Sequence, residues 1–160
     1  MDRQDSDGLG TREDMIVYCM EKAYGDLEDA VDLYRKGVKE NKPTSIDNAA
    51  SRSYYGIFSA ICAVHVLHGT TFKKHRDAIG QFNKLYVHEG VFPKEYGRRI
   101  THAERCRNTA EYNFIAHAKR EDVKESIRFA REFIPKVASY LLEKTGIERP
   151  KGCTGFEHAG

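Results

Sequence analysis

The segment ERCRNTAEYNF, residues 104–114, brings arginine, asparagine and tyrosine side chains close together on a predicted helix. The apolar spacing of four and three residues that begins at Tyr96 reaches Arg107, which therefore lies on the inward side of that helix. A guanidinium stays charged at neutral pH and can bind two phosphate oxygens at once. Arg107 thus predicts either a site for an anionic ligand, such as a nucleotide or an RNA backbone, or an ion pair with a core acid such as Asp47.

Neighbouring polar residues extend this predicted site. The same helix carries four arginines against three acids, which suits it to a phosphate ligand. Arg52 lies one helical turn before Tyr55, and it is interpreted either as the structural partner of that tyrosine or as a second phosphate contact. The sequence predicts ligand contacts by six residues: Arg107, Asn108, Tyr112, Arg105, Arg52 and Tyr55.

Three further features have simpler interpretations. The segment KKHR, residues 73–76, is a second basic cluster or a solvated surface turn. His65 and His68 share a helix face, but no carboxylate or cysteine supplies an obvious further metal ligand. Cys106 lies between two arginines without a histidine at a catalytic spacing. We therefore predict no metal and no cofactor, and we expect the four widely separated cysteines to be free thiols.

Composition indicates one helical domain. The chain has 160 residues, of which 31% are charged and 40% hydrophobic, and this length suffices for a sizeable core. No apolar run reaches the ~18 residues of a membrane span. The start MDRQDSDGLG also lacks the basic flank and the apolar stretch of a signal peptide. We therefore expect a cytoplasmic protein.

Helical periodicity recurs along the chain, and strand alternation does not. Helices are predicted over 11–42, where Pro43 ends the helix, from Ser45 as N-cap to Gly69, over 74–89, from Pro93 past Ala110, and over 123–141. The last helix is expected to be kinked or interrupted by Pro135. The predicted fold is all-α, an antiparallel four-helix up-and-down bundle plus a short additional helix. This bundle is expected over 11–144, between a flexible N-terminus, 1–10, and a flexible tail, 145–160.

Four segments together resemble the HEPN domain family. AASRSYYGIFSA, residues 49–60, is similar to its A-x-x-R-x-Y-Y-A-x-F segment. EKAYGDLEDAVDLYRKG resembles its first helix, KKHRDAIGQFNKLYV its short middle helix, and RCRNTAEYN the R-N-x-A-D-Y segment of its fourth helix. The four segments follow one another in the family's order, across about residues 15–144.

This resemblance implies several functions. Many HEPN proteins are metal-independent ribonucleases, in which both subunits of a dimer contribute an arginine followed four to six residues later by a histidine. Many are encoded beside a small nucleotidyltransferase as a toxin and antitoxin pair, and others bind nucleotides without known cleavage. By position, the motif arginine corresponds to Arg107, and the polar residue after it to Asn108.

The sequence departs from this motif at the histidine. The window after Arg107 holds Tyr112 to Phe114 instead, and the nearest histidines, His102 and His117, lie outside it. A tyrosine with a pKa of about 10 is a poor general base at neutral pH, although it can donate a hydrogen bond or stack on a base. Phe114 also occupies the place of the tyrosine that one branch of the family adenylylates. The chain thus resembles the R-x-x-x-[DE]-Y subgroup.

Two functions from different classes follow. The first is a homodimeric module that binds a nucleotide or RNA and engages a nucleotidyltransferase partner in a toxin–antitoxin-like pair. The second is a metal-independent ribonuclease in which Tyr112, or His102 from across a dimer interface, replaces the histidine. A purely structural role for Arg107 is the third interpretation.

Overall fold

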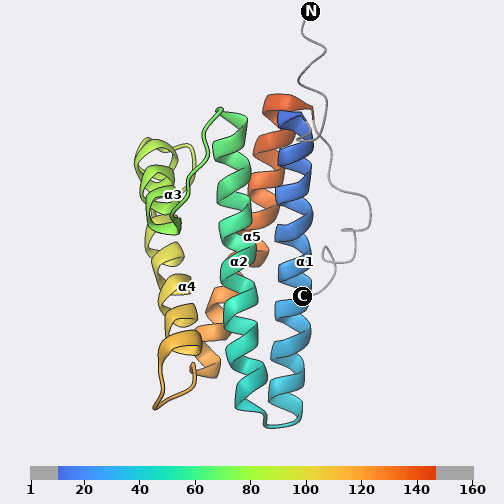
Figure 1. Cartoon of the computed structure of the whole chain (residues 1–160), viewed down its shortest axis with the longest axis vertical. Helices are drawn as coiled ribbons and strands as arrows, with labels where there is room; N and C mark the ends of the chain where they lie inside the picture. Colours follow the sequence, from blue (N-terminus) through green and yellow to red (C-terminus); the bar gives the residue numbers. More distant parts are fainter. Residues whose placement is uncertain (1–10, 147–160) are drawn as a thin grey trace, which may run out of the picture.

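The computed structural model describes residues 11–146, which form five α-helices and no strand. They are α1 (Arg12–Lys39), α2 (Pro43–Leu67), α3 (His75–Phe82), α4 (Glu95–Tyr112) and α5 (Arg120–Thr145). The four long helices alternate in direction, and α3 packs at one end beside α2 and α4 (Figure 1). The predicted antiparallel bundle with a short additional helix is confirmed. The predicted flexible N-terminus and all but the first two residues of the predicted tail lie outside the described residues.

The connection between α1 and α2 starts and ends earlier in the sequence than predicted. α1 begins with a capping box, in which Thr11 and Asp14 each bond the other's backbone N–H, and it ends at Lys39. Pro43 does not follow the end of α1 directly but starts α2, two residues before the predicted N-cap Ser45. A proline is tolerated there because the first helical turn has no use for its missing N–H.

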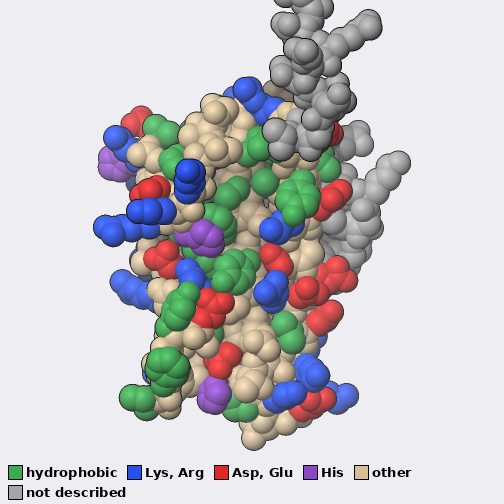
Figure 2. Space-filling model, viewed as in Figure 1, with side chains coloured by type: hydrophobic (Ala, Val, Ile, Leu, Met, Phe, Trp, Pro, Cys, Tyr) green, Lys and Arg blue, Asp and Glu red, His purple; other side chains and the backbone are tan. Residues whose placement is uncertain are grey.

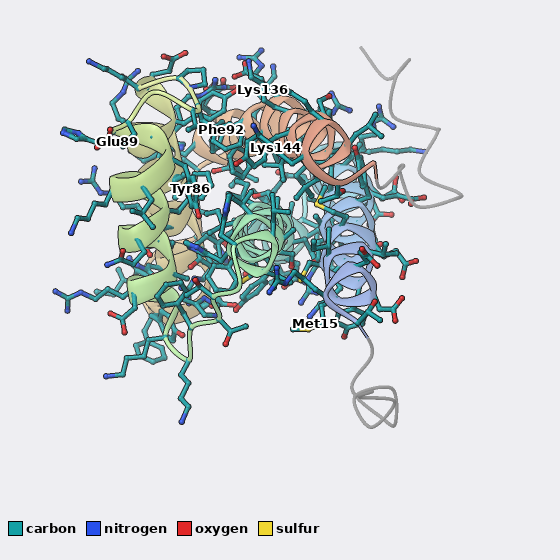
Figure 3. All side chains as sticks on the ribbon, turned by 90° about the horizontal axis from the view of Figure 1, so that it is seen from above. Met15, Tyr86, Glu89, Phe92, Lys136 and Lys144 are labelled. Atoms are coloured by element: carbon teal, nitrogen blue, oxygen red, sulfur yellow. The ribbon has the colours of Figure 1, made fainter. Side chains whose placement is uncertain are left out.

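α2 is the central helix of the bundle. Buried residues occupy most of its circumference, as the nearly continuous apolar sequence predicted, and the face that carries Asn48, Arg52 and Tyr55 is partly exposed. Seen along the bundle, α2 lies between α1 and the side formed by α3 and α4 (Figure 3). Gly56 allows α1 to approach closely, since a Cβ there would lie 3.0 Å from the carbonyl oxygen of Ala23. The residues of α2 can therefore contact side chains from each of the other helices.

The other predicted helices need small corrections. The predicted helix 74–89 is α3 followed by a π-helical turn, η1 (Asn83–Val87). α5 continues through Pro135 to Thr145, so the proline removes one backbone donor without ending the helix. None of the described helices is long and apolar enough to cross a membrane.

An aromatic cluster fixes α3, α4 and α5 against one another. Phe133 lies at its centre, with its ring centroid 5.2–6.1 Å from the rings of four neighbours: Phe82, Phe92, Tyr96 and Phe129. In Figure 3, Phe92 lies on the inner side of this region while Glu89 lies at its outer edge. The cluster holds α4 in place, and α4 carries Arg107.

Candidate functional site

Arg107 lies on the inward seam of α4, where its spacing predicted it. Tyr96, Ile100 and Ala103 on the same seam are buried, and the Arg107 side chain is 13% exposed. Its guanidinium carbon lies 4.5 Å from the centre of the Tyr54 ring on α2. A cation over an aromatic face is attracted by the negative face of the ring, so Tyr54 fixes the position of the guanidinium.

Polar contacts join Arg107 to α2 through an acid. Arg107 Nη1 donates to Glu111 Oε2 over 3.2 Å and to the hydroxyl oxygen of Tyr112 over 3.3 Å. The Tyr55 hydroxyl donates to the other carboxylate oxygen, Glu111 Oε1, over 2.9 Å. Arg107 Nε is buried and has no hydrogen-bond partner among the described residues. The guanidinium is therefore held through Nη1, while its buried Nε donor stays unused.

A histidine that sequence reasoning missed joins this cluster. His75, the first residue of α3, places Nδ1 3.2 Å from the Tyr54 hydroxyl and stacks on Phe58 at 3.8 Å between ring centroids. Burial, together with the positive charge of Arg107, lowers the pKa of His75, which keeps the ring neutral at neutral pH. Burial also raises the pKa of Tyr54 to about 12, so its hydroxyl stays protonated. We call Arg107, Glu111, Tyr112, Tyr54, Tyr55 and His75 the Arg107 cluster.

The only signal for His75 in the sequence was the basic segment KKHR. His75 precedes Arg107 by 32 residues, so no motif spacing connects the two. Their proximity depends on how α3 and α4 pack on α2.

Two further predicted contacts, Arg52 and Asn108, lie near the cluster. The Arg52 guanidinium carbon lies 5.5 Å from the centre of the Tyr55 ring, and its Nη1 forms an ion pair of 3.3 Å with Asp26 Oδ1 on α1. Arg52 is thus a structural partner of both residues, and its predicted phosphate contact stays a prediction. Asn108 follows Arg107 on α4 and is exposed.

Arg105 lies apart from the cluster. It precedes Arg107 by two residues, which turns it about 200° around the helix. It lines a separate groove between α4, α5 and η1, together with Arg98, Arg99 and His102. Arg99 is already paired there with Glu125 and Glu132 on α5. The four arginines of α4 therefore do not form one site, and a ligand contact by Arg105 would need this second groove.

The alternative prediction, that Asp47 pairs with Arg107, is wrong. Asp47 forms a short contact with His117 and accepts the backbone N–H of Ala118 over 2.8 Å, so it closes the start of α5 onto α2. The acid that pairs with Arg107 is Glu111, one turn further along α4 and 28% exposed. Arg107 is therefore not half of a fully buried ion pair.

The histidines and the cysteine considered for other chemistry have structural contacts. His65 Nε2 lies 2.8 Å from the carbonyl oxygen of Ala78, and His68 Nε2 lies 3.0 Å from the Tyr140 hydroxyl. Burial raises the pKa of Cys106, so the flanking arginines do not activate its thiol. Among the residues that the structure describes, no three histidine, cysteine or acidic side chains converge as a metal site.

Residues 16–141 match the family described as HEPN domain. A UPF0332 protein of Thermotoga maritima is 28% identical over 133 residues, which is 83% of this chain and 96% of that protein. Two proteins of Methanocaldococcus jannaschii, each named "Putative toxin", are 27% and 32% identical over 125 and 97 residues. These matches cover 78% and 60% of this chain, and 80% and 71% of those proteins.

Proposed function

Because this chain belongs to the HEPN domain family, we propose that it acts as a dimeric module that binds the phosphate of a nucleotide or RNA at Arg107. We further propose that it is the HEPN subunit of a toxin–antitoxin-like pair with a nucleotidyltransferase. The toxin names of two relatives support the second part. An assay for it is co-purification of the neighbouring gene's product with this protein.

The phosphate proposal rests on the hydrogen bonds that the Glu111 carboxylate accepts. The carboxylate receives hydrogen bonds from Arg107 on α4 and from Tyr55 on α2, so donors from two helices converge on one pair of oxygens. A phosphate presents similar oxygens to the same donors. Glu111 is 28% exposed and can turn into solvent when an anionic ligand replaces it. Arg107 Nη1, which now donates to Glu111, is then free to donate to the phosphate.

The direct test is titration with a nucleotide at two salt concentrations. Ion pairs with phosphate release bound counterions, so the affinity should fall as salt rises. An affinity that does not change with salt, or no binding at either concentration, would contradict the proposal.

A ribonuclease is the second candidate, because His75 supplies a neutral imidazole within the Arg107 cluster. We nevertheless expect the purified protein to cleave RNA weakly or not at all. His75 Nδ1 contacts the Tyr54 hydroxyl and its ring is stacked on Phe58, which limits its access to a substrate hydroxyl. The measurement is release of fragments from a labelled single-stranded RNA without metal. Robust cleavage that is lost in both Arg107→Ala and His75→Ala, but kept in the exposed control His88→Ala, would favour the ribonuclease instead.

The loop after α4 is the proposed dimer contact. The side chains of Phe114 and Ile115 are 100% and 97% exposed, beside Tyr112 at 64%. Asn113 Oδ1 accepts the backbone N–H groups of Ile115 and Ala116, and these bonds form the turn that presents the apolar side chains. Large apolar side chains that lie together and fully exposed are typical of interaction surfaces.

We therefore expect light scattering to give twice the chain mass of 18.3 kDa. The double variant Phe114→Ser with Ile115→Ser should shift the protein toward monomer, because it removes the apolar surface that the dimer would bury. Val91→Ser, at a residue 45% exposed near the opposite end of α4, is the control and should stay dimeric. A wild-type monomer at high micromolar concentration would argue against the dimer.

A further inference from the structure

A groove between α1 and α2 adjoins the Arg107 cluster. Tyr18, Lys22 and Asp26 recur every four residues, so they form one stripe along α1. This stripe faces Arg52 and Tyr55 on α2, and the groove between the two helices is open to solvent. In Figure 2 the face over these helices shows hydrophobic side chains interleaved with acidic and basic ones and a histidine.

The walls of the groove are flat rings with cations beside them. Tyr18 is 61% exposed, with the Lys22 ammonium 5.6 Å from its ring centre. Phe58 and His75 also line the groove and are partly exposed, since they cover one face of each other at 3.8 Å between ring centroids. Exposed aromatic faces and nearby cations are the features with which proteins bind unstacked nucleobases.

Asp26 supplies a hydrogen-bond acceptor at the same place. Its side chain is 15% exposed, and Arg52 contacts only Oδ1. Oδ2 makes no hydrogen bond to any other part of the chain that the structure describes. A carboxylate accepts hydrogen bonds at both oxygens and the guanidinium beside it donates.

The Watson–Crick edge of guanine matches this pair better than the other bases do. It carries two adjacent donors, N1–H and N2–H, for a carboxylate and the acceptor O6 for a guanidinium. Adenine, cytosine and uracil each offer a carboxylate only one donor position on that edge.

We infer that this groove binds the base of the nucleotide whose phosphate binds at Arg107, with guanine preferred. The inference rests on the proposed phosphate site, and the structure links the two places through shared residues. His75 contacts Tyr54, whose ring lies against Arg107, and Tyr55 bonds the same Glu111 carboxylate as Arg107 does. His75 and Tyr55 also line the groove.

The experiment is calorimetric titration of the full chain with 5′-GMP, 5′-CMP, ribose 5-phosphate and guanosine. We expect GMP to bind about tenfold more tightly than ribose 5-phosphate, since stacking of one base contributes roughly that factor. Tyr18→Ala should remove this advantage and leave ribose 5-phosphate unchanged, whereas Tyr18→Phe should keep it because stacking needs only the ring. Asp26→Asn should reduce the affinity for GMP to that for CMP. Leu142→Ala, at a residue 47% exposed on α5, is the control and should change nothing.

Equal affinities for GMP and ribose 5-phosphate, or unchanged GMP binding in Tyr18→Ala, would overturn the inference. Guanosine has no phosphate, so its binding depends on the groove alone and not on the phosphate site at Arg107. If ribose 5-phosphate fails to bind while guanosine binds in a Tyr18-dependent manner, the phosphate proposal fails and the groove stands. The single-stranded RNA UUGUU identifies the source of the base: tighter binding than GMP indicates RNA, and equal binding a free nucleotide. Both results support a base site.

Discussion

Replacing Arg107 with methionine is expected to abolish salt-dependent nucleotide binding while the free energy of unfolding changes by no more than about 1 kcal/mol. The guanidinium provides the charge for the phosphate, so its removal should cost at least tenfold in affinity. Methionine keeps a long side chain against the Tyr54 ring. Glu111 is 28% exposed, and water can solvate its carboxylate once the arginine is gone. The measurements are the denaturation midpoint and binding at two salt concentrations.

The matched control is Arg105→Met on the opposite side of the same helix. It makes the same chemical change at an exposed residue that is not part of the Arg107 cluster. Nucleotide binding should be retained there. If Arg107 were half of a buried ion pair, Arg107→Met would instead cost about 3 to 5 kcal/mol. Such a loss, or unchanged binding in Arg107→Met, would mean that Arg107 is structural and that the phosphate site lies elsewhere.

Phe133→Ala should have the largest effect on stability, a loss of about 3 to 5 kcal/mol. Phe133 is completely buried on α5, and its ring contacts aromatic rings from α3, α4, α5 itself and the loop before α4. The close-packed rings around it cannot collapse fully into the space that alanine would leave. Chemical denaturation followed by circular dichroism measures the loss.

Phe133→Leu is the control for this substitution, because it keeps most of the buried apolar volume and should cost clearly less. Nucleotide binding by Phe133→Ala should be unchanged where the variant is still folded, since Phe133 does not touch the Arg107 cluster. A loss below about 1.5 kcal/mol would mean that the aromatic cluster repacks, contrary to the rigid support that we assign to it.

The helices could be predicted from the sequence because each long helix has an apolar stripe that must be buried. The same rule placed Arg107 on the inward seam, since position on a stripe depends only on residues of the same helix. Pro43 was misplaced because a proline fits both after one helix and at the start of the next. Asn41 has a positive φ of 48° and therefore already lies in the turn between the helices. Pro43, which follows this turn, starts α2.

The partners of Arg107 could not be predicted in this way. Tyr54 and His75 approach it from two other helices, and that contact depends on the packing of segments 32 or more residues apart in sequence. Arg105 was grouped with Arg107 because the two are close in sequence. The periodicity of the helix already separates them, so this grouping could have been avoided.

The close packing of α1 against α2 has a consequence for the order of folding. Only three residues connect the two helices, and short connections lose little entropy on closure. Helical hairpins with such local contacts form early, whereas α5 can dock only when the whole chain is available. The ion pair between Asp26 and Arg52 should therefore form before Phe133 reaches the aromatic cluster. During synthesis, the walls of the groove would then be assembled on a chain whose core is still incomplete.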